Sequence, residues 1–181
     1  ARGISTTYGY DAATGDLASV DYSDSTPDVT FTRDRLRRIS TAADAVGTRT
    51  MQYDPYHLQL TDEQITGLYD RTIHRAYAED GPVLGRPTGL NIGTEYATTW
   101  GYDDDPQVGT GRLLQVTGPG LPAYGAVYGY ETNSDLVALT GFMLDESTAR
   151  GTATRTFETH RDVTTDVANV WGTTPVSTYH Y

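Results

Sequence analysis

Two stretches of this chain repeat each other in register. Residues 130–136 read Tyr-Glu-Thr-Asn-Ser-Asp-Leu, and 27 residues later residues 157–163 read Phe-Glu-Thr-His-Arg-Asp-Val. An aromatic residue, Glu-Thr, two variable residues, Asp and an aliphatic residue therefore occur twice. Similarity at a spacing of roughly 20 to 50 residues indicates a repeat architecture, in which each unit buries its apolar surface against its neighbours. The repeat predicts an array of similar units.

The first unit predicts a β-hairpin. Tyr8 and Tyr10 alternate, which favours a strand with both rings on one face. Asp11 and Gly15 follow as turn residues, since Asp hydrogen-bonds its own backbone and Gly accepts positive φ. Leu17 then begins the returning strand.

Further copies follow at similar intervals, and together they predict an all-β fold. A step of about 24 residues holds two strands of roughly 6–9 residues and two connections. We expect consecutive hairpins to pair edge to edge in one antiparallel sheet, which twist makes curl into a spiral. In the second unit Arg33 and Arg37 replace the second Tyr and the turn Gly, and the copy at residues 77–90 is a weaker match. The equivalent residues, separated by 20 to 28 residues, are Tyr10, Arg33, Tyr53, Tyr77, Tyr102, Tyr130, Phe157 and Tyr181.

This organisation predicts one array of about seven hairpin units across residues 1–181. Because units begin before the first residue and continue past the last, we expect a segment truncated at both ends of a larger polypeptide. Residues 61–78 are open to two interpretations, a helix or strands, since apolar residues occur at helical spacing but Gly67 and the Thr-rich context oppose a helix. Residues 119–122, Pro-Gly-Leu-Pro, predict a loop.

Composition narrows the classes of partner. The net charge is −11, which disfavours binding to phosphate backbones and to anionic membranes. Fourteen of the aromatic residues are Tyr, and all 13 basic residues are Arg. Arg pairs with carboxylates and stacks on rings, so we expect Arg, Tyr and Asp side chains to connect the strands. Cysteine is absent, and no apolar run is long enough for a transmembrane helix.

Tyr-x-Tyr-Asp followed by a short turn, Gly-Arg-Leu and a β-branched strand resembles the tyrosine-aspartate (YD) repeat of Rhs-type proteins. The best matches are residues 8–20, 31–39 and 100–116. The repeat-motif residues are Tyr8, Tyr10, Asp11, Gly15, Leu17, Phe31, Asp34, Tyr53, Asp54, Trp100, Tyr102, Asp103, Gly111, Arg112, Leu113, Tyr128, Tyr130, Asp135, Phe157 and Asp162.

The resemblance implies a hairpin sheet that spirals into a hollow shell. Members of the family include components of insecticidal ABC toxin complexes, Rhs and wall-associated toxins, and teneurin adhesion proteins. In toxin members the shell holds a C-terminal effector, often released by self-cleavage at an Asp-Pro-x-Gly type signature. The segments 54–57 (Asp-Pro-Tyr-His) and 105–108 (Asp-Pro-Gln-Val) do not match that signature, so no protease residue is assigned.

Candidate chemical sites each have a simpler structural interpretation. The carboxylates of residues 103–105 offer oxygen ligands for Ca²⁺, but the repeat explains Asp103 as a turn residue. The four histidines lack zinc-binding spacing, which favours surface histidines without a ligand role. Asp135 and Asp162, with Glu131 and Glu158, suggest a two-carboxylate glycosidase, yet a duplicated pair fits a structural turn better. We therefore expect no catalytic residue, metal or cofactor. The histidines are His57, His74, His160 and His180.

Two functions follow as hypotheses. The first is a structural segment of a secreted or surface protein, which encloses or supports another polypeptide such as a toxin effector. Its partners are the flanking repeats and the enclosed chain. The second is an adhesion or carbohydrate-binding scaffold, in which exposed tyrosines stack on sugar rings of a surface glycan or receptor. An assembling extracellular fibre is a third and weaker hypothesis, since both ends of the array leave open strand edges.

Overall fold

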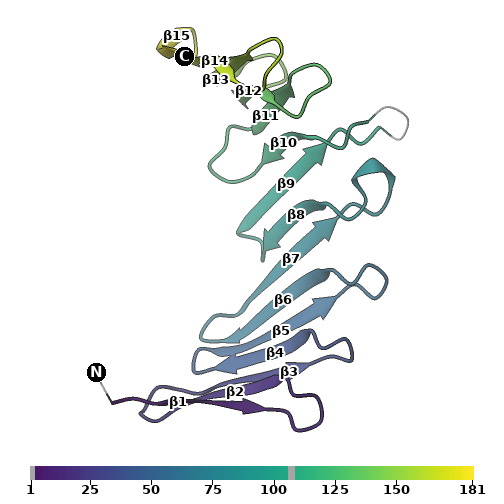
Figure 1. Ribbon diagram of the computed structural model, residues 1–181, viewed down its shortest axis with the longest axis vertical. Helices are drawn as coiled ribbons and strands as arrows, with labels where there is room; N and C mark the ends of the chain where they lie inside the picture. Colours follow the sequence, from purple (N-terminus) through teal and green to yellow (C-terminus); the bar gives the residue numbers. More distant parts are fainter. Residues whose placement is uncertain (1–2, 106–108) are drawn as a thin grey trace. The chain divides into compact units, whose positions relative to one another are not determined.

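The computed structural model describes residues 3–105 and 109–181, and it is built almost wholly from β-strands (Figure 1). One 3₁₀ turn, η1 (Gly81–Val83), interrupts them. The strands are β1 (Thr6–Tyr10), β2 (Leu17–Tyr22), β3 (Val29–Arg33), β4 (Ile39–Asp44), β5 (Gly47–Tyr53), β6 (Leu60–Gly67), β7 (Arg71–Tyr77), β8 (Pro87–Ile92), β9 (Tyr96–Tyr102), β10 (Leu113–Thr117), β11 (Ala126–Tyr130), β12 (Val137–Met143), β13 (Ala149–Phe157), β14 (Thr164–Trp171) and β15 (Thr174–His180).

Each strand is hydrogen-bonded to the strands before and after it in the chain, in the order β1 to β15. The recorded ladders are antiparallel, so the prediction of an all-β fold made of consecutive hairpins is confirmed. The predicted curl into a spiral concerns the array as a whole and stays a prediction. Residues 119–122 lie outside the strands, as expected for a loop.

The helical interpretation of residues 61–78 is wrong. This stretch forms β6 and β7, joined by a turn. Gly67 has a φ of 121°, which no residue of an α-helix adopts. Five residues of β6 pair with β5 in unbroken register from Asp62 to Thr66, so the ladder satisfies backbone groups that a helix would have satisfied internally.

The chain divides into two compact units, residues 1–75 with 91–95 and residues 76–90 with 96–181. Within each unit the recorded strand contacts join neighbours in the chain, as expected for a single-layer sheet. Among the described residues only Val83 and Ala126 are buried apolar side chains, each 5% exposed. The exposed surface, 12171 Å², exceeds the roughly 8,600 Å² expected for a compact monomer of this mass. Stability therefore comes from many half-buried contacts, without a central core.

The two faces of the sheet in unit 1 differ in chemistry. Strand alternation and register place Thr30, Thr32, Thr41, Thr48 and Thr50 on one face. A hydrogen bond of 2.6 Å between the Thr32 and Thr41 hydroxyls confirms that these two side chains share it. The opposite face is more apolar and carries Val20, Val29, Phe31, Ala42, Met51, Ile65 and Ile73.

In unit 2 one face contains the larger rings. Register places Trp100, Phe142 and Trp171 on the same face through successive ladders. Gly151 lies directly opposite Trp171, and a Cβ on this glycine would lie 2.8 Å from the indole ring. A side chain at residue 151 would therefore displace the ring. The described part of the chain contains no helix with the length and hydropathy needed to cross a bilayer.

Candidate functional site

The candidate site is the edge of the sheet where the repeat-motif turns lie. In the first hairpin the Asp11 amide donates to the Asp16 carbonyl (2.8 Å), and the Gly15 amide donates to the Asp11 carbonyl (2.8 Å). Gly15 has a φ of 72°, a conformation that glycine adopts without strain. The strand before the turn shifts register between Gly9 and Tyr10. Strand end, bulge and turn thus form one local unit.

The same backbone pattern recurs at six further turns in the described part of the chain. The residue after the strand exchanges backbone hydrogen bonds with two residues near the end of the turn. Arg37 and Leu58 adopt the positive φ that Gly15 adopts in the first hairpin, at 66° and 63°. The residues after the strand, which we call the turn heads, are Asp11, Asp34, Asp54, Ala78, Asp103, Glu131 and Glu158.

The four aspartate turn heads also cap their turns with the side chain. The Asp11 carboxylate accepts the Ala13 and Thr14 amides at 3.0 and 2.8 Å. These bonds, the Thr14 amide first, lower the pKa of Asp11 below its usual value. Bonds from the backbone of His57 and of Thr110 lower the pKa of Asp54 and of Asp103 in the same way. Burial opposes the shift at Asp34, but hydrogen bonds from Arg38 outweigh it and the pKa is lowered.

Tyrosines at the strand ends bond to the preceding hairpin. The Tyr53 hydroxyl donates to the Ile39 carbonyl at 2.9 Å, and the Tyr130 hydroxyl donates to the Leu113 carbonyl at 2.7 Å. Tyr102 makes the equivalent bond to the Pro87 carbonyl at 2.9 Å. Each of the three tyrosines is half-buried. Its hydroxyl forms a hydrogen bond, while its apolar ring packs along the sheet.

An arginine of the preceding hairpin lies over each of these rings. Its side chain also donates to a carbonyl in the next turn, as Arg112 does to Ser134 (2.6 Å) and Arg38 to Leu58 (3.0 Å). We call the contact between the last residue of one turn and the strand-end residue of the next hairpin a junction. The guanidinium-to-ring distances are 4.0 Å for Arg38 and Tyr53, 5.6 Å for Arg86 and Tyr102, and 5.3 Å for Arg112 and Tyr130.

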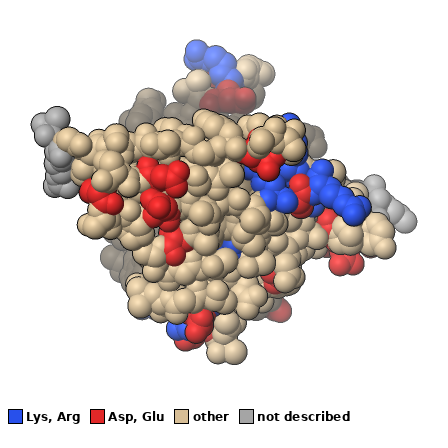
Figure 2. Space-filling model, turned by 90° about the horizontal axis from the view of Figure 1, so that it is seen from below, with Lys and Arg blue, Asp and Glu red and all other residues tan. Residues whose placement is uncertain are grey.

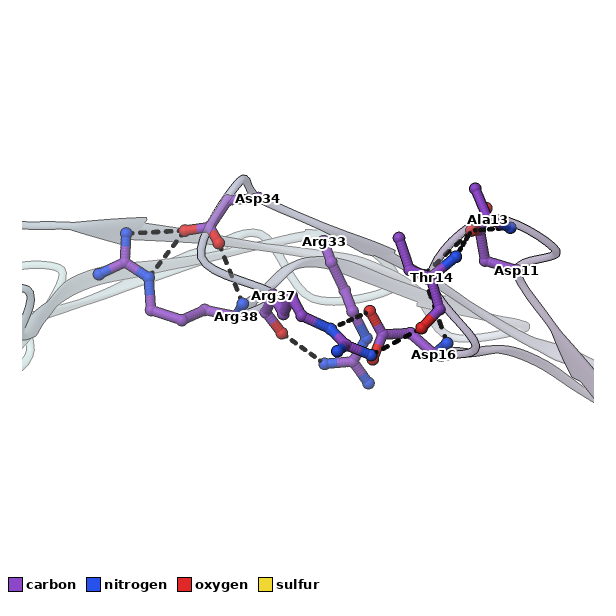
Figure 3. Close-up of polar contacts among 8 residues, drawn as sticks. All are labelled: Asp11, Ala13, Thr14, Asp16, Arg33, Asp34, Arg37 and Arg38. Carbon is purple, nitrogen blue, oxygen red and sulfur yellow. Dashed lines mark hydrogen bonds and ion pairs between the residues drawn. The ribbon is translucent and has the colours of Figure 1, made fainter.

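At the first junction an aspartate and an arginine take the two positions that an arginine and a tyrosine hold later in the chain. Asp16 stands where later hairpins have the arginine, and Arg33 stands where they have the tyrosine. The Arg37 guanidinium holds the Asp16 carboxylate with two bonds, of 2.6 and 2.9 Å, and also donates to the Thr14 carbonyl (Figure 3). This pairing lowers the pKa of Asp16 and raises the pKa of Arg37. Arg33 donates to the Arg37 carbonyl at 2.9 Å.

A third chemistry occupies the junction between the hairpins β11–β12 and β13–β14. Here Leu136 and Phe157 hold the two positions, and both line one groove on this edge. The same place in the repeat is thus filled by an ion pair, by a cation over a ring, or by two apolar side chains. The expectation that Arg, Tyr and Asp side chains connect the strands is confirmed.

The other repeat-motif residues lie within or next to this frame. Asp135 is exposed, with its carboxylate 3.4 Å from Arg112 Nε, and Asp162 is exposed in its turn. Both lie beyond the turn head, which in these two hairpins is Glu131 or Glu158, so they are not equivalent to Asp11. Gly111 accepts a hydrogen bond from the Arg86 guanidinium. The remaining strand residues are Tyr8, Tyr10, Leu17, Phe31, Trp100, Leu113 and Tyr128.

The carboxylates considered for Ca²⁺ have a structural use at Asp103. Its Oδ2 accepts the Thr110 amide at 3.0 Å and the Thr110 hydroxyl at 2.8 Å. Within residues 3–105 and 109–181, no group of three or more acidic, His or Cys side chains is arranged to hold a metal ion. Three histidines each face one aspartate, and one of these pairs is His74 with Asp62 at 2.9 Å.

Sequence reasoning missed three junction residues, Asp16, Arg38 and Arg86. Their partners belong to the next hairpin, so no motif within one hairpin identifies them. A usable signal exists, because each of the three directly precedes a returning strand, as Arg112 of the Gly-Arg-Leu motif does. Aligning that position across the repeats would have found them.

Beside the first junction lies a groove that we call the arginine groove, lined by Leu17, Ala18, Phe31, Arg33, Arg35 and Arg37. Residues 33–38 contain four of the 13 arginines. Figure 2, which views the molecule from the β1 end, shows a band of blue basic side chains on the right with red carboxylates among them, and smaller blue groups elsewhere. Of the four, Arg37 and Arg38 are each held by an aspartate.

Comparison with known proteins gives structural likeness without a family. The sequence matches no protein-family model and no curated protein. A crystal structure of TcdB2-TccC3-TEV is 14% identical over 96% of this chain, with a TM-score of 0.48. A crystal structure of TcdB2-TccC3-Cdc42 is 14% identical over 93% of this chain, with a TM-score of 0.49. The matched region spans 12% and 11% of those chains, so function is argued below from the residues of this chain.

Proposed function

We propose that this chain is a structural segment of a YD-repeat array of the Rhs type, and that its sheet forms part of a shell that encloses or supports another polypeptide. The observation that carries the proposal is the recurrence of one junction at successive hairpins. Arg38–Tyr53, Arg86–Tyr102 and Arg112–Tyr130 use the same contacts. A contact repeated along an array holds units together, whereas an active site needs one unique set of residues.

The single-layer construction supports the same role. Each strand is held by its neighbours through backbone ladders, and the junctions described above join successive hairpins within each unit at the turn edge. Unit 1 presents a Thr-rich face and a more apolar face, so its sheet can separate two environments. Closing such a sheet into a shell removes its exposed edges and keeps an enclosed chain away from proteases.

The proposal assigns the flanking repeats and the enclosed polypeptide as partners, a secreted or surface location, and no catalytic reaction. Its test is an electron-microscopy reconstruction of the full-length protein that contains this chain. A closed, hollow body with density inside supports the proposal. A filled rod or an open surface contradicts it. Protease digestion is the second measurement, and an enclosed segment cut as fast in the intact protein as in its denatured form would also contradict it.

A second candidate function, carbohydrate binding, is favoured by one surface of unit 2. Trp171 and Phe142 are 55% and 39% exposed, and they share a groove with Leu121, Pro122 and Arg150. Exposed rings offer flat apolar faces to sugar rings. Binding to a glycan panel that is lost in the Trp171→Ala variant and retained in Tyr56→Ala, whose exposed ring lies in unit 1, would favour this function. Absence of binding on the panel would remove it.

A further inference from the structure

The arginine groove contains two guanidinium groups, of Arg33 and Arg35, that form no ion pair with any described residue. Arg37 and Arg38 are paired with Asp16 and Asp34. Arg35 is exposed on the groove and has no acidic partner among the described residues. Arg33 is fixed by its bond to the Arg37 carbonyl, yet its Nε is buried without a hydrogen-bond partner in the part of the chain that the structure describes.

Such an arrangement favours an anion in the groove. A buried donor without an acceptor carries a desolvation cost of roughly 1–3 kcal/mol, and more when the group is charged. Two guanidinium groups in one groove also repel each other unless an anion lies between them. At the later junctions the tyrosines in the Arg33 position donate to carbonyls of the preceding hairpin, as Tyr53 and Tyr130 do. Arg112 Nε also lacks a hydrogen-bond partner, but it lies 3.4 Å from the Asp135 carboxylate, whereas Arg33 forms no ion pair among the described residues.

The surroundings select the kind of anion. Asp11, Asp16 and Asp34 border the groove, and their charges oppose a dianionic phosphate more strongly than a monoanionic carboxylate. The pairs Arg37–Asp16 and Arg38–Asp34 show that arginines of this turn hold carboxylates through two bonds. The apolar side chains of Leu17, Ala18 and Phe31 line the same groove. A carboxylate with an apolar neighbour therefore fits best.

We infer that the arginine groove binds a side-chain carboxylate of an acidic polypeptide segment that carries an apolar residue beside the acid. The exposed guanidinium of Arg35 supplies a positive charge, and the guanidinium of Arg33 supplies N–H donors held in place by its bond to the Arg37 carbonyl. The apolar neighbour packs against Phe31 and Leu17. This inference stands independently of the proposed function, since any acidic polypeptide of that pattern qualifies, whether enclosed by the array or outside it.

The test is a titration of the 1–181 chain with a fluorescein-labelled peptide of alternating Phe and Glu, followed by fluorescence anisotropy. Arg35→Gln is expected to weaken binding about fivefold, because an exposed charge-assisted bond is lost. Arg33→Tyr installs the residue used at the later junctions and is expected to weaken binding at least as much. The control is Arg161→Gln, which removes the same charge from an exposed pair in unit 2 and should leave binding unchanged.

Any of four results would overturn the inference. The first is equal binding of wild type, Arg35→Gln and Arg33→Tyr with circular dichroism spectra unchanged. The second is equal binding of a peptide of alternating Phe and Gln. The third is displacement of the Phe-Glu peptide by inorganic phosphate beyond that caused by sodium chloride at the same ionic strength, which would replace the carboxylate with phosphate as the ligand. Loss of binding in Arg161→Gln as well would reduce the effect to net charge and also contradict the assigned groove.

Discussion

The first junction and the arginine–tyrosine junctions occupy the same place in the repeat, but the first is built on an acidic residue and an ion pair, and the others on an arginine over a ring. Between hairpins β1–β2 and β3–β4, Asp16 faces the guanidinium of Arg37 and lies near Arg33. Between β9–β10 and β11–β12, Arg112 lies over the ring of Tyr130. The backbone turn is alike in both. The fold thus preserves a position and allows its chemistry to change, provided that both partners change together.

The two kinds of junction also differ in how they gain stability. Tyr130 is half-buried, and burial raises the pKa of its hydroxyl, which stays neutral and bonded to the Leu113 carbonyl. The Arg37 side chain is 59% exposed, so solvent screens its attraction to Asp16. Ring burial is less sensitive to solvent, and we expect the ring junctions to contribute more free energy of unfolding.

The largest effect is therefore expected at a ring junction. Tyr130→Ala removes the ring, its hydroxyl bond and the surface under Arg112, and should lower the free energy of unfolding by about 2–3 kcal/mol. Tyr130→Phe removes the hydroxyl alone and should cost about 1 kcal/mol. Urea denaturation followed by circular dichroism measures both. Equal losses in the two variants would mean that the ring contributes nothing, which contradicts the comparison.

A second experiment converts the first junction into the second kind. The triple variant Asp16→Arg, Arg33→Tyr, Arg37→Gly installs the residues found at Arg86, Tyr102 and Gly111. Asp16→Arg alone should destabilise, because it places a third arginine beside Arg33 and Arg37. The triple variant should recover at least the stability of the wild type. A triple variant that is less stable than the sum of the single changes would show that the junctions are not interchangeable.

The third prediction uses pH to separate the junctions. Hydrogen bonding to Arg37 holds the pKa of Asp16 below its usual value in the folded chain. The stability from this pair is therefore complete above the unfolded pKa of about 3.9 and is lost as the pH falls through the lower folded pKa. The stability difference between wild type and Asp16→Asn should shrink as the pH falls from about 5 to about 3. The difference between wild type and Tyr130→Phe should stay constant over the same range, and a parallel decrease would contradict the assignment.

The smallest effect concerns the turn residue itself. Leu58 and Arg37 both adopt positive φ, which costs roughly 1 kcal/mol for residues with a Cβ. Leu58→Gly should recover part of that cost and stabilise by about 0.5 kcal/mol in thermal unfolding. Arg37→Gly relieves the same strain but loses the bond to Asp16, so it should not stabilise. A gain in Arg37→Gly equal to that in Leu58→Gly would remove the ion pair from the account of the first junction.

Much of the fold follows from the sequence because the repeat marks strand ends. Seven of the eight residues taken as equivalent close strands in the structure, among them Tyr10 in β1, Arg33 in β3 and Tyr53 in β5, whereas Tyr181 follows the end of β15. Even the replacement of the turn glycine by Arg37 is reproduced, with a φ of 66°. These features are local, since an Asp head, a positive φ and a bulge involve only neighbouring residues. Local chemistry is what a single sequence reports most directly.

The junctions could not be predicted because they join residues of different hairpins. Arg38 meets Tyr53, and the register that brings them together is set by β4 and β5, which the motif does not describe. The motif also does not reveal that Glu131, and not Asp135, takes the role of turn head in its hairpin. The Thr-rich face of unit 1 has a sequence signal in Thr-x-Thr at residues 30–32 and 48–50, but pairing decides that these residues share a face.

The junction has a consequence for how such an array can grow by gene duplication. A matched pair such as Arg38 and Tyr53 spans the last residue of one turn and the end of the next hairpin's first strand. Duplicating the β1–β2 hairpin alone would bring Asp16 against a second Tyr10 and leave a mismatched contact. Copying the segment that runs from the end of one turn to the end of the next keeps each pair together. A duplicated segment that keeps the junction pairs matched is therefore offset by half a hairpin from the β-hairpin itself.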